Sequence, residues 1–207
     1  MKYSAGDLVK RSAAQLVFLR EKLESILTAR MLKGENFQSK IVKDESLSNV
    51  VADEMRGCYA YNDIEIFFCI DMIKNGNFYE IKSVFDKNGN DSLEYDDWYL
   101  NSSLLQCAFY KSLLLKMEGN RLYTPKFRIK EGYKKISLEI NKSNPYYLIF
   151  GKIGTWEVKV INPDEIINFY KDKISHLKYM EDAKVFDLKF KHKEFELLNP
   201  YFQYNKL

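Results

Sequence analysis

The sequence has few of the residues from which disulfide scaffolds, metal clusters and catalytic triads are built. Its 207 residues include three cysteines (Cys58, Cys69 and Cys107) and two histidines (His176 and His192). No two cysteines form a Cys-x-x-Cys pair, so we expect buried thiols in place of a disulfide framework, a zinc site or an iron–sulfur cluster. Both histidines lie far along the chain from other candidate ligands, which makes a Ser-His-Asp or Cys-His enzyme a poor candidate.

Glycine, proline and long apolar runs are also scarce. The chain contains nine glycines and four prolines, and aromatic residues make up 15% of it, a composition that excludes intrinsic disorder. No apolar run approaches the roughly 18–20 residues of a membrane-spanning helix. The first seven residues lack the apolar core and cleavage site of a signal peptide. We therefore expect a cytoplasmic protein without membrane contacts, forming a single domain over residues 1–207.

Charge is small in total, at +3, but unevenly placed. Residues 1–43 carry a net charge of +5, residues 44–101 carry −9 and residues 121–142 again carry +5. An acidic centre between basic segments can bind a divalent cation in the middle and a polyanion around it. Ordinary solvated surfaces explain the same pattern, and from charge alone they are the favoured explanation.

Hydrophobic periodicity predicts an α/β protein in which a mixed sheet is flanked by helices. Helices are expected over residues 6–32, 37–42 and 98–117 and from Asn162, where Asn-Pro-Asp-Glu is a typical helix start. Strands are expected over 59–73 (one strand or a pair), 78–85, 122–130, 134–140, 146–150 and 155–161, with an exposed loop over 86–97.

The most informative stretch surrounds Asn75-Gly76, the strongest short signal for a β-hairpin. With a turn at 74–77, Asp71 and Glu80 stand opposite each other, and Lys82 lies on the same strand face as Glu80. Two carboxylates at that distance repel unless a cation lies between them or one is protonated. Mg²⁺ suits the pair, and Lys82 would stabilise a transferring phosphate or orient and help to deprotonate the attacking water. A surface hairpin with a cross-strand charge ladder is an equally good explanation of these three residues.

Two further signals favour the site. Gln106 and Tyr110 stand one helical turn apart in an otherwise apolar helix, so they share one face. Upstream, Gly34 and Gln38 are spaced by four residues after the first predicted helix.

In this order the residues resemble the RecB-like branch of the PD-(D/E)xK nuclease superfamily. That branch has a Gly-xxx-His element, an Asp that ends a strand, Glu-x-Lys on the next strand and Gln-xxx-Tyr on the following helix. The resemblance covers residues 16–118 and implies a restriction-endonuclease-like core, about 5–161, followed by a C-terminal extension of strand and helix, about 162–207.

The resemblance implies Asp71 and Glu80 as catalytic metal ligands, the Ile81 carbonyl as a third ligand and Lys82 as the group that serves the attacking water. Gln38 stands where many members have a metal-binding histidine, and an amide oxygen is a weaker, neutral donor. Gln106 and Tyr110 would contact the DNA backbone or brace the site.

Beyond the resemblance, the basic segment is expected to bind DNA. If 122–130 is a strand, alternation places Lys126, Arg128 and Lys130 on one face, where they could line a groove beside the hairpin. A solvated outer face explains these residues equally well.

The sequence therefore favours a Mg²⁺- or Mn²⁺-dependent deoxyribonuclease, exonuclease-like, in phage or bacterial DNA metabolism. Its expected partners are DNA, as single strands or duplex ends, and a helicase or recombination protein acting in trans. The alternative is a nucleic-acid-binding protein on the same fold with weak or no catalysis, which the substitution of Gln38 for histidine motivates.

Overall fold

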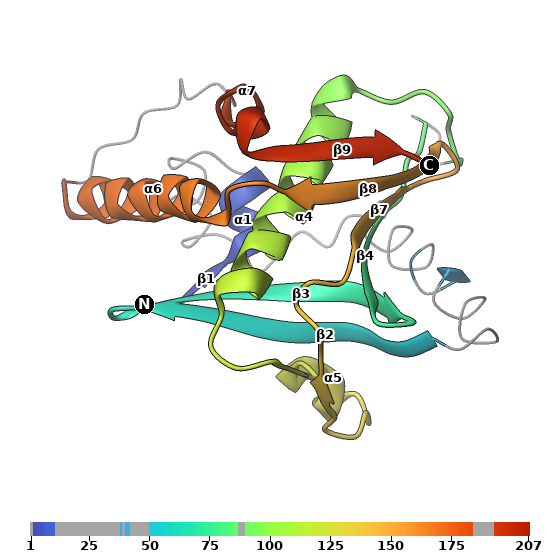
Figure 1. Ribbon diagram of the computed structural model, residues 1–207, viewed down its shortest axis with the longest axis horizontal. Helices are drawn as coiled ribbons and strands as arrows, with labels where there is room; N and C mark the ends of the chain where they lie inside the picture. The colour runs from blue at the N-terminus through green and yellow to red at the C-terminus, as the bar shows by residue number, and fades with distance from the viewer. Residues whose placement is uncertain (1, 11–37, 39, 42–49, 87–89, 184–192) are drawn as a thin grey trace.

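A computed structural model describes residues 2–10, 38, 40–41, 50–86, 90–183 and 193–207 (Figure 1). Within these ranges the strands form one mixed nine-stranded sheet. Along the sheet the order is β6 (Ser137–Glu139), β5 (Arg121–Tyr123), β2 (Val50–Tyr61), β3 (Ile64–Lys74), β4 (Asn77–Lys82), β7 (Tyr146–Phe150), β8 (Gly154–Val160) and β9 (Phe202–Lys206). The ninth strand, β1 (Lys2–Ser4), pairs in parallel with β3; β4 and β7 are also parallel, and the other pairs are antiparallel.

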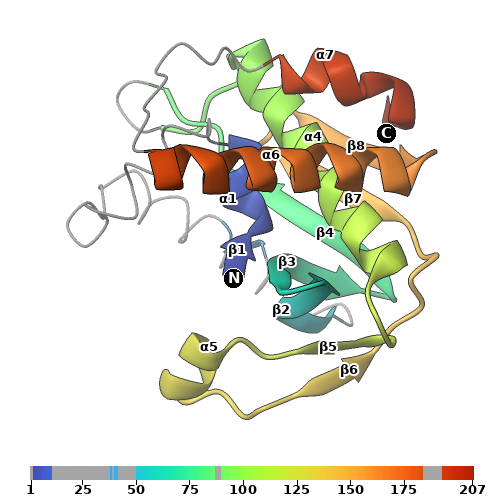
Figure 2. The same ribbon diagram turned by 90° about the vertical axis from the view of Figure 1, so that its left-hand side faces the viewer.

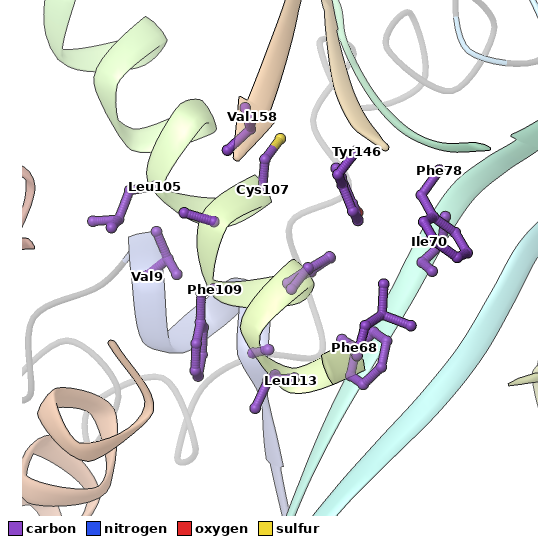
Figure 3. Packing of buried hydrophobic residues seen from close by; sticks show 14 of the residues in the cluster. Val9, Phe68, Ile70, Phe78, Leu105, Cys107, Phe109, Leu113, Tyr146 and Val158 are labelled. Atoms are coloured by element: carbon purple, nitrogen blue, oxygen red, sulfur yellow. The ribbon is translucent and has the colours of Figure 1, made fainter. Parts of the chain in front are cut away.

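Helix α4 (Asp97–Lys116) is the centre of the helical layer. It packs against β2, β7 and β8 on the sheet and against α1 (Ala5–Lys10) and α6 (Pro163–Ala183) beside it. Every residue from 102 to 114 is buried, so α4 is enclosed on all sides and its polar side chains need partners inside the protein. Figure 3 shows Leu105, Phe109 and Leu113 of α4 in the core that α4 shares with α1 and the sheet. The predicted α/β class, a mixed sheet flanked by helices, is confirmed.

Local sequence signals explain where the two long helices begin. The Asp96 carboxylate accepts a hydrogen bond from the Trp98 amide at 2.9 Å and caps α4. Asn162 accepts one from the Glu165 amide at 3.4 Å, with Pro163 as the first helical residue of α6. Both predicted helix starts are confirmed.

Strand β2 is longer than the sequence suggests. It begins at Val50, whereas the sequence predicts a start near residue 59. The prediction missed the first half of the strand because the polar stretch from Asp53 to Arg56 lacks the alternation of a half-buried strand. Pairing with β3 stabilises it, through a turn at Asn62-Asp63 in which Asn62 has a φ of 49°.

The strand predicted over 122–130 is wrong. Residues 121–123 form β5, and after Pro125 the chain turns into a short helix, α5 (Lys126–Lys130). Proline favours a helix start and cannot donate to a strand ladder, which accounts for the change. Lys126 and Lys130 therefore share a helix face that Arg128 does not, so the three do not lie together on one strand face. The strand predicted over 134–140 is present only as Ser137–Glu139.

The C-terminal residues join the same sheet and helical layer. Strand β9 extends the sheet beyond β8, and α6 packs on α4. Lys173 of α6 donates hydrogen bonds to Glu194 of α7 (Glu194–Leu198) and to the Leu8 carbonyl, and both charged groups are buried. The extension predicted from residue 162 is thus attached to α1 and α4 by packing and by a buried ion pair.

No helix in the described part of the chain combines the length and apolar character needed to span a membrane. The first predicted helix is described only as α1, up to Lys10. Its remainder, Gly34 and the second Asn-Gly pair at Asn88-Gly89 lie outside the described residues.

Candidate active site

The hairpin of β3 and β4 positions the first two candidate residues. Asn75 and Gly76, with φ of 51° and 80°, form the two-residue turn, and the ladder runs from Lys74–Asn77 to Met72–Tyr79. The same register places Asp71 opposite Glu80, as predicted from the turn. There the ladder ends, and Asp71 Oδ2 instead accepts a hydrogen bond from the Ile81 amide at 2.8 Å.

The backbone of β4 turns the Ile81 carbonyl toward Asp71. The Phe78 amide donates to the Pro145 carbonyl at 3.0 Å, and the Lys82 carbonyl accepts from the Gly151 amide at 2.6 Å, so even-numbered residues face the β7 side. In a strand, the two polar groups of one residue point the same way and those of its neighbour point the opposite way. The N–H and C=O of Ile81 therefore both face the β3 side, where the Asp71 carboxylate lies.

Glu80, Lys82 and Gln106 meet in a buried cluster. Glu80 is 2% exposed, Lys82 9% and Gln106 3%. Glu80 Oε1 accepts hydrogen bonds from the Lys82 ammonium and, at 2.7 Å, from Gln106 Nε2. Glu80 Oε2 and Gln106 Oε1 are buried with no hydrogen-bond partner. Such atoms are costly inside a protein, so this position suits an ordered water or a ligand.

One stripe of α4 lines the site. Tyr99, Ser103, Gln106 and Tyr110 follow the i, i+4, i+7, i+11 spacing of a single helix face. The Tyr99 hydroxyl donates to the Ser83 carbonyl at 3.2 Å and so holds the residue that follows Lys82. Tyr110 is buried, and a Cβ on Gly6 of α1 would lie 2.9 Å from its hydroxyl. Only a glycine at position 6 lets α1 approach Tyr110 this closely.

The charges of the cluster set the protonation of its members. Burial alone would lower the pKa of Lys82, but the negative charges of Glu80 and Asp71 and the hydrogen bond to Glu80 outweigh it and raise that pKa. Lys82 therefore carries its charge at neutral pH. Burial, followed by the charge of Glu80, raises the pKa of the Tyr110 and Tyr146 hydroxyls, so both remain neutral.

The donor atoms suit a hard divalent cation. The described residues contain no group of three or more His, Cys, Asp and Glu side chains able to hold a metal. Mg²⁺ needs only one or two carboxylates, because it keeps several waters and accepts phosphate oxygens. Glu80 Oε2 is the unused carboxylate oxygen here. Asp71 is opposite Glu80 in the hairpin register, and its carboxylate lies on the Ile81 amide. The residues present therefore fit Mg²⁺ or Mn²⁺.

A third carboxylate lies across from Asp71. Asp53 pairs with Met72 and Met55 with Ile70, so Glu54 of β2 is opposite Asp71. Glu54 has a φ of 46°, which is rare for a non-glycine residue inside a strand. Burial, together with the charges of Asp71, Glu54 and Glu80, raises the pKa of the Cys69 thiol on β3. Cys69 is therefore a neutral thiol, two residues from Asp71 on the same strand.

Of the predicted basic contacts, Arg128 is engaged within the protein. Its guanidinium donates to both carboxylate oxygens of Glu54, at 2.6 and 2.5 Å. Lys126 and Lys130 are exposed on α5. Gln38 is helical and half-buried, and its role as a metal ligand stays a prediction.

Sequence reasoning missed four residues at the site. Tyr99 could have been found from its helical spacing to Gln106. Gly6, Glu54 and Tyr146 had no signal, because long-range packing brings them to the site. Figure 3 shows Tyr146 beside Phe78 in the core, and the two rings stack with their centroids 6.0 Å apart. The buried Tyr146 hydroxyl has no hydrogen-bond partner.

Comparisons with known proteins give no family for this chain. No family model matches the chain, and no curated protein matches it. Among solved structures, the crystal structure of SSO0001 is similar over 84% of this chain and 76% of that chain, with a TM-score of 0.48 and 15% sequence identity. At this level the likeness carries no argument about function.

Proposed function

We propose that this protein is a Mg²⁺- or Mn²⁺-dependent nuclease that hydrolyses phosphodiester bonds of DNA, with its active site at Asp71, Glu80 and Lys82. One observation carries the proposal. A buried carboxylate has one oxygen bound by a lysine and a glutamine, while its other oxygen has no partner. The carboxylate belongs to Glu80, and the charge of Asp71, its neighbour across the hairpin, acts on the same lysine. Buried polar atoms in proteins are seldom without a partner, so the spare oxygen supports a ligand at this position.

Each residue has a definable task in this reaction. Asp71, Glu80 Oε2 and the Ile81 carbonyl would hold the cation, which supplies Lewis-acid polarisation of the phosphate and neutralises its charge. Gln106 orients Glu80 by donating to Oε1. Lys82 carries its charge, so it acts as a hydrogen-bond donor that orients the attacking water or stabilises the phosphate oxygens. The water oxygen forms the new bond to phosphorus and gives up a proton to solvent. The bond from phosphorus to the leaving sugar oxygen breaks, and that oxygen takes up a proton from solvent.

Metal-dependent cleavage tests the proposal directly. The protein is incubated with linear duplex, circular duplex and single-stranded DNA in Mg²⁺, Mn²⁺ or EDTA, with RNA as a parallel substrate. Cleavage is expected with either metal, none is expected in EDTA, and Lys82→Ala should lower the rate about 100- to 1,000-fold. Lys159→Ala, at an exposed lysine on β8, is the matched control and should cleave like the wild type. Equal rates for Lys82→Ala and wild type would overturn the assignment of the site.

A second function, nucleic-acid binding without catalysis, is favoured by a specific feature of the same cluster. The Lys82 ammonium already balances the charge of Glu80, so the pair is compensated without a cation. The same experiment separates the two functions, because this alternative predicts retention of DNA in every condition and cleavage in none.

A further inference from the structure

Residues 121–139 form an arm at the edge of the sheet, made of β5, α5 and β6 (Figure 2). This arm carries six basic and two acidic residues, a net charge of +4. Four of the basic residues are exposed lysines: Lys126, Lys130, Lys134 and Lys135. The arm is therefore a basic surface on a chain whose total charge is only +3.

Exposed aromatic rings are interleaved with these lysines. Tyr123 is 45% exposed and Tyr133 is 44% exposed. Such exposure is notable because burying an aromatic ring is energetically favourable. Arg128 lies over the Tyr133 ring, 5.1 Å from its centroid, and its guanidinium is 3.4 Å from the Tyr133 hydroxyl. The ring is thus held in place while much of its surface stays open to solvent.

Arg128 anchors the arm to β2, at Glu54, the residue that is opposite Asp71. It binds Glu54 through two parallel hydrogen bonds, and the two side chains are only 22% and 18% exposed. Bidentate, partly desolvated pairs of this kind are among the strongest and most directional polar contacts in proteins. Because Glu54 is opposite Asp71 in the β2–β3 register, the anchor fixes the arm relative to the candidate active site.

The root of the arm is close to the site. Tyr123 of β5 pairs with Arg56 of β2, and Arg56 pairs with Cys69 of β3, two residues from Asp71. Strand spacings of about 4.8 Å and a rise of about 3.4 Å per residue put the Cα atoms of Tyr123 and Asp71 about 12 Å apart. Arg56 lies between them, and its buried Nε atom has no hydrogen-bond partner. The Arg56 side chain is half-buried, and a guanidinium on this path suits a phosphate oxygen.

We propose that the arm binds a single strand of nucleic acid, with bases stacked on Tyr123 and Tyr133 and phosphates on its lysines, and leads that strand past Arg56 to Asp71. Exposed aromatic rings combined with basic side chains characterise surfaces that bind single strands, because every unpaired base offers a face for stacking. A duplex keeps its bases stacked inside and would use only the lysines. The inference deepens the proposed function, and in its last step it depends on that function, since Asp71 is taken as the place of cleavage.

Binding is measured by fluorescence anisotropy of labelled oligo(dT), alone or annealed to its complement, in EDTA so that no cleavage is needed. Tyr133→Ser should weaken binding of the single strand about 5- to 150-fold and change binding of the duplex little. Lys134→Glu/Lys135→Glu should lower the slope of log affinity against log salt by about 1.4 for the single strand. The matched controls, Tyr204→Ser on β9 and Lys159→Glu/Lys206→Glu on β8 and β9, should bind like the wild type.

These results separate failure of the inference from failure of the proposed function. If the arm variants bind oligo(dT) with unchanged affinity and salt slope, the arm is not the binding surface, whether or not the wild type cleaves DNA. Equal losses for duplex and single strand would also overturn the inference, because they indicate contacts to the backbone alone. If the arm variants lose binding while no metal supports cleavage, the arm assignment stands and the nuclease proposal fails.

The anchor has its own test, because Arg128 is here a positioning residue and not a DNA contact. Glu54→Gln removes the charge that holds Arg128 but leaves the tyrosines and lysines of the arm in place. It should alter KM for single-stranded DNA less than twofold, lower kcat and broaden the distribution of cleavage positions from the labelled end. Arg128→Lys, which loses the bidentate geometry, should act in the same direction. An unchanged product pattern for both variants would exclude an anchoring role.

Discussion

Lys82 and Glu80 project from the same face of β4, and the buried ammonium of Lys82 donates a hydrogen bond to Glu80 Oε1. Gln106 shares that oxygen from the helical layer. The pair therefore links the sheet to α4 as well as supplying charge to the candidate site, and the stability of the fold depends on it.

Glu80→Gln should abolish cleavage and also lower the free energy of unfolding by about 3–5 kcal/mol, because it removes the hydrogen-bonded counter-charge of the buried Lys82 ammonium. The double variant Glu80→Gln/Lys82→Met should recover most of this loss, since no buried charge remains. Urea unfolding measures both effects. If the double variant is no more stable than Glu80→Gln alone, the pair does not account for the loss.

Asp71→Asn is the contrasting substitution. The amide oxygen of asparagine can still accept the hydrogen bond from the Ile81 amide, and one negative charge near Glu80 is removed. Asparagine is a neutral and weaker metal ligand, so cleavage should be lost. The relieved repulsion from Glu80 offsets the lost attraction to Lys82, so the melting temperature should hold. A variant that keeps full turnover in Mg²⁺ would remove Asp71 from the site.

Local sequence signals predict the central part of this site because they fix geometry over short distances. The Asn-Gly turn sets the hairpin register, and register alone brings Asp71 opposite Glu80. Helical spacing places Gln106 and Tyr110 on one face, and Gln106 does contact Glu80. Each of these contacts lies within one hairpin or between that hairpin and one helix.

The remaining features depend on pairings that no local pattern encodes. The parallel pairing of β4 with β7 brings Tyr146 beneath the site, and strand alternation carries no information about which strand becomes the neighbour. The ion pair of Glu54 with Arg128 joins residues 74 positions apart. The prediction of a strand over 122–130 was wrong because it overlooked Pro125. The ring of this residue favours a helix start, and the helix that follows places Arg128 against Glu54.

Gly6→Ala should disturb the site from the helical layer. The new Cβ would lie 2.9 Å from the Tyr110 hydroxyl, and overpacking of this kind costs about 1–3 kcal/mol. Alanine recovers about 1 kcal/mol through its helix propensity, so a net loss of about 1 kcal/mol is expected. Adding Tyr110→Phe, which removes the hydroxyl, should relieve the clash. Thermal unfolding of the four proteins in this cycle gives the coupling energy, and a coupling near zero would contradict the contact.

Lys111 should make stability rise with pH in the mildly alkaline range. Burial lowers the pKa of Lys111 to about 8, while its ammonium donates to the carbonyls of Lys142 and Asn144. The unfolded chain, with an ordinary lysine pKa of about 10.4, then binds more protons than the folded protein between the two values. The free energy of unfolding therefore rises with pH above pH 8. The slope from this one group is smaller than about 1.4 kcal/mol per pH unit.

Lys111→Met supplies the control for this slope, because other groups titrate nearby. Lys173, whose pKa burial also lowers, contributes in the same direction in both proteins. The difference in the free energy of unfolding between the wild type and Lys111→Met thus isolates the titration of Lys111. It is measured from pH 8 to about 9.5, a range that lies below the ordinary pKa of tyrosine. A difference that does not change with pH would mean that Lys111 keeps its proton throughout.

Gln38 should tune the choice of metal without being required for turnover. An amide oxygen lacks the nitrogen donor that favours Co²⁺ or Ni²⁺, so the site should accept Mg²⁺ and Mn²⁺ and gain little from softer ions. Gln38→His should strengthen Mn²⁺ binding. Gln38→Ala should weaken metal affinity several-fold and leave some activity at high metal concentration. The alternative is that Gln38 only braces its own helix. Titrating Mn²⁺ against cleavage rate for the three proteins decides between them, and three superimposable curves would exclude Gln38 from the metal site.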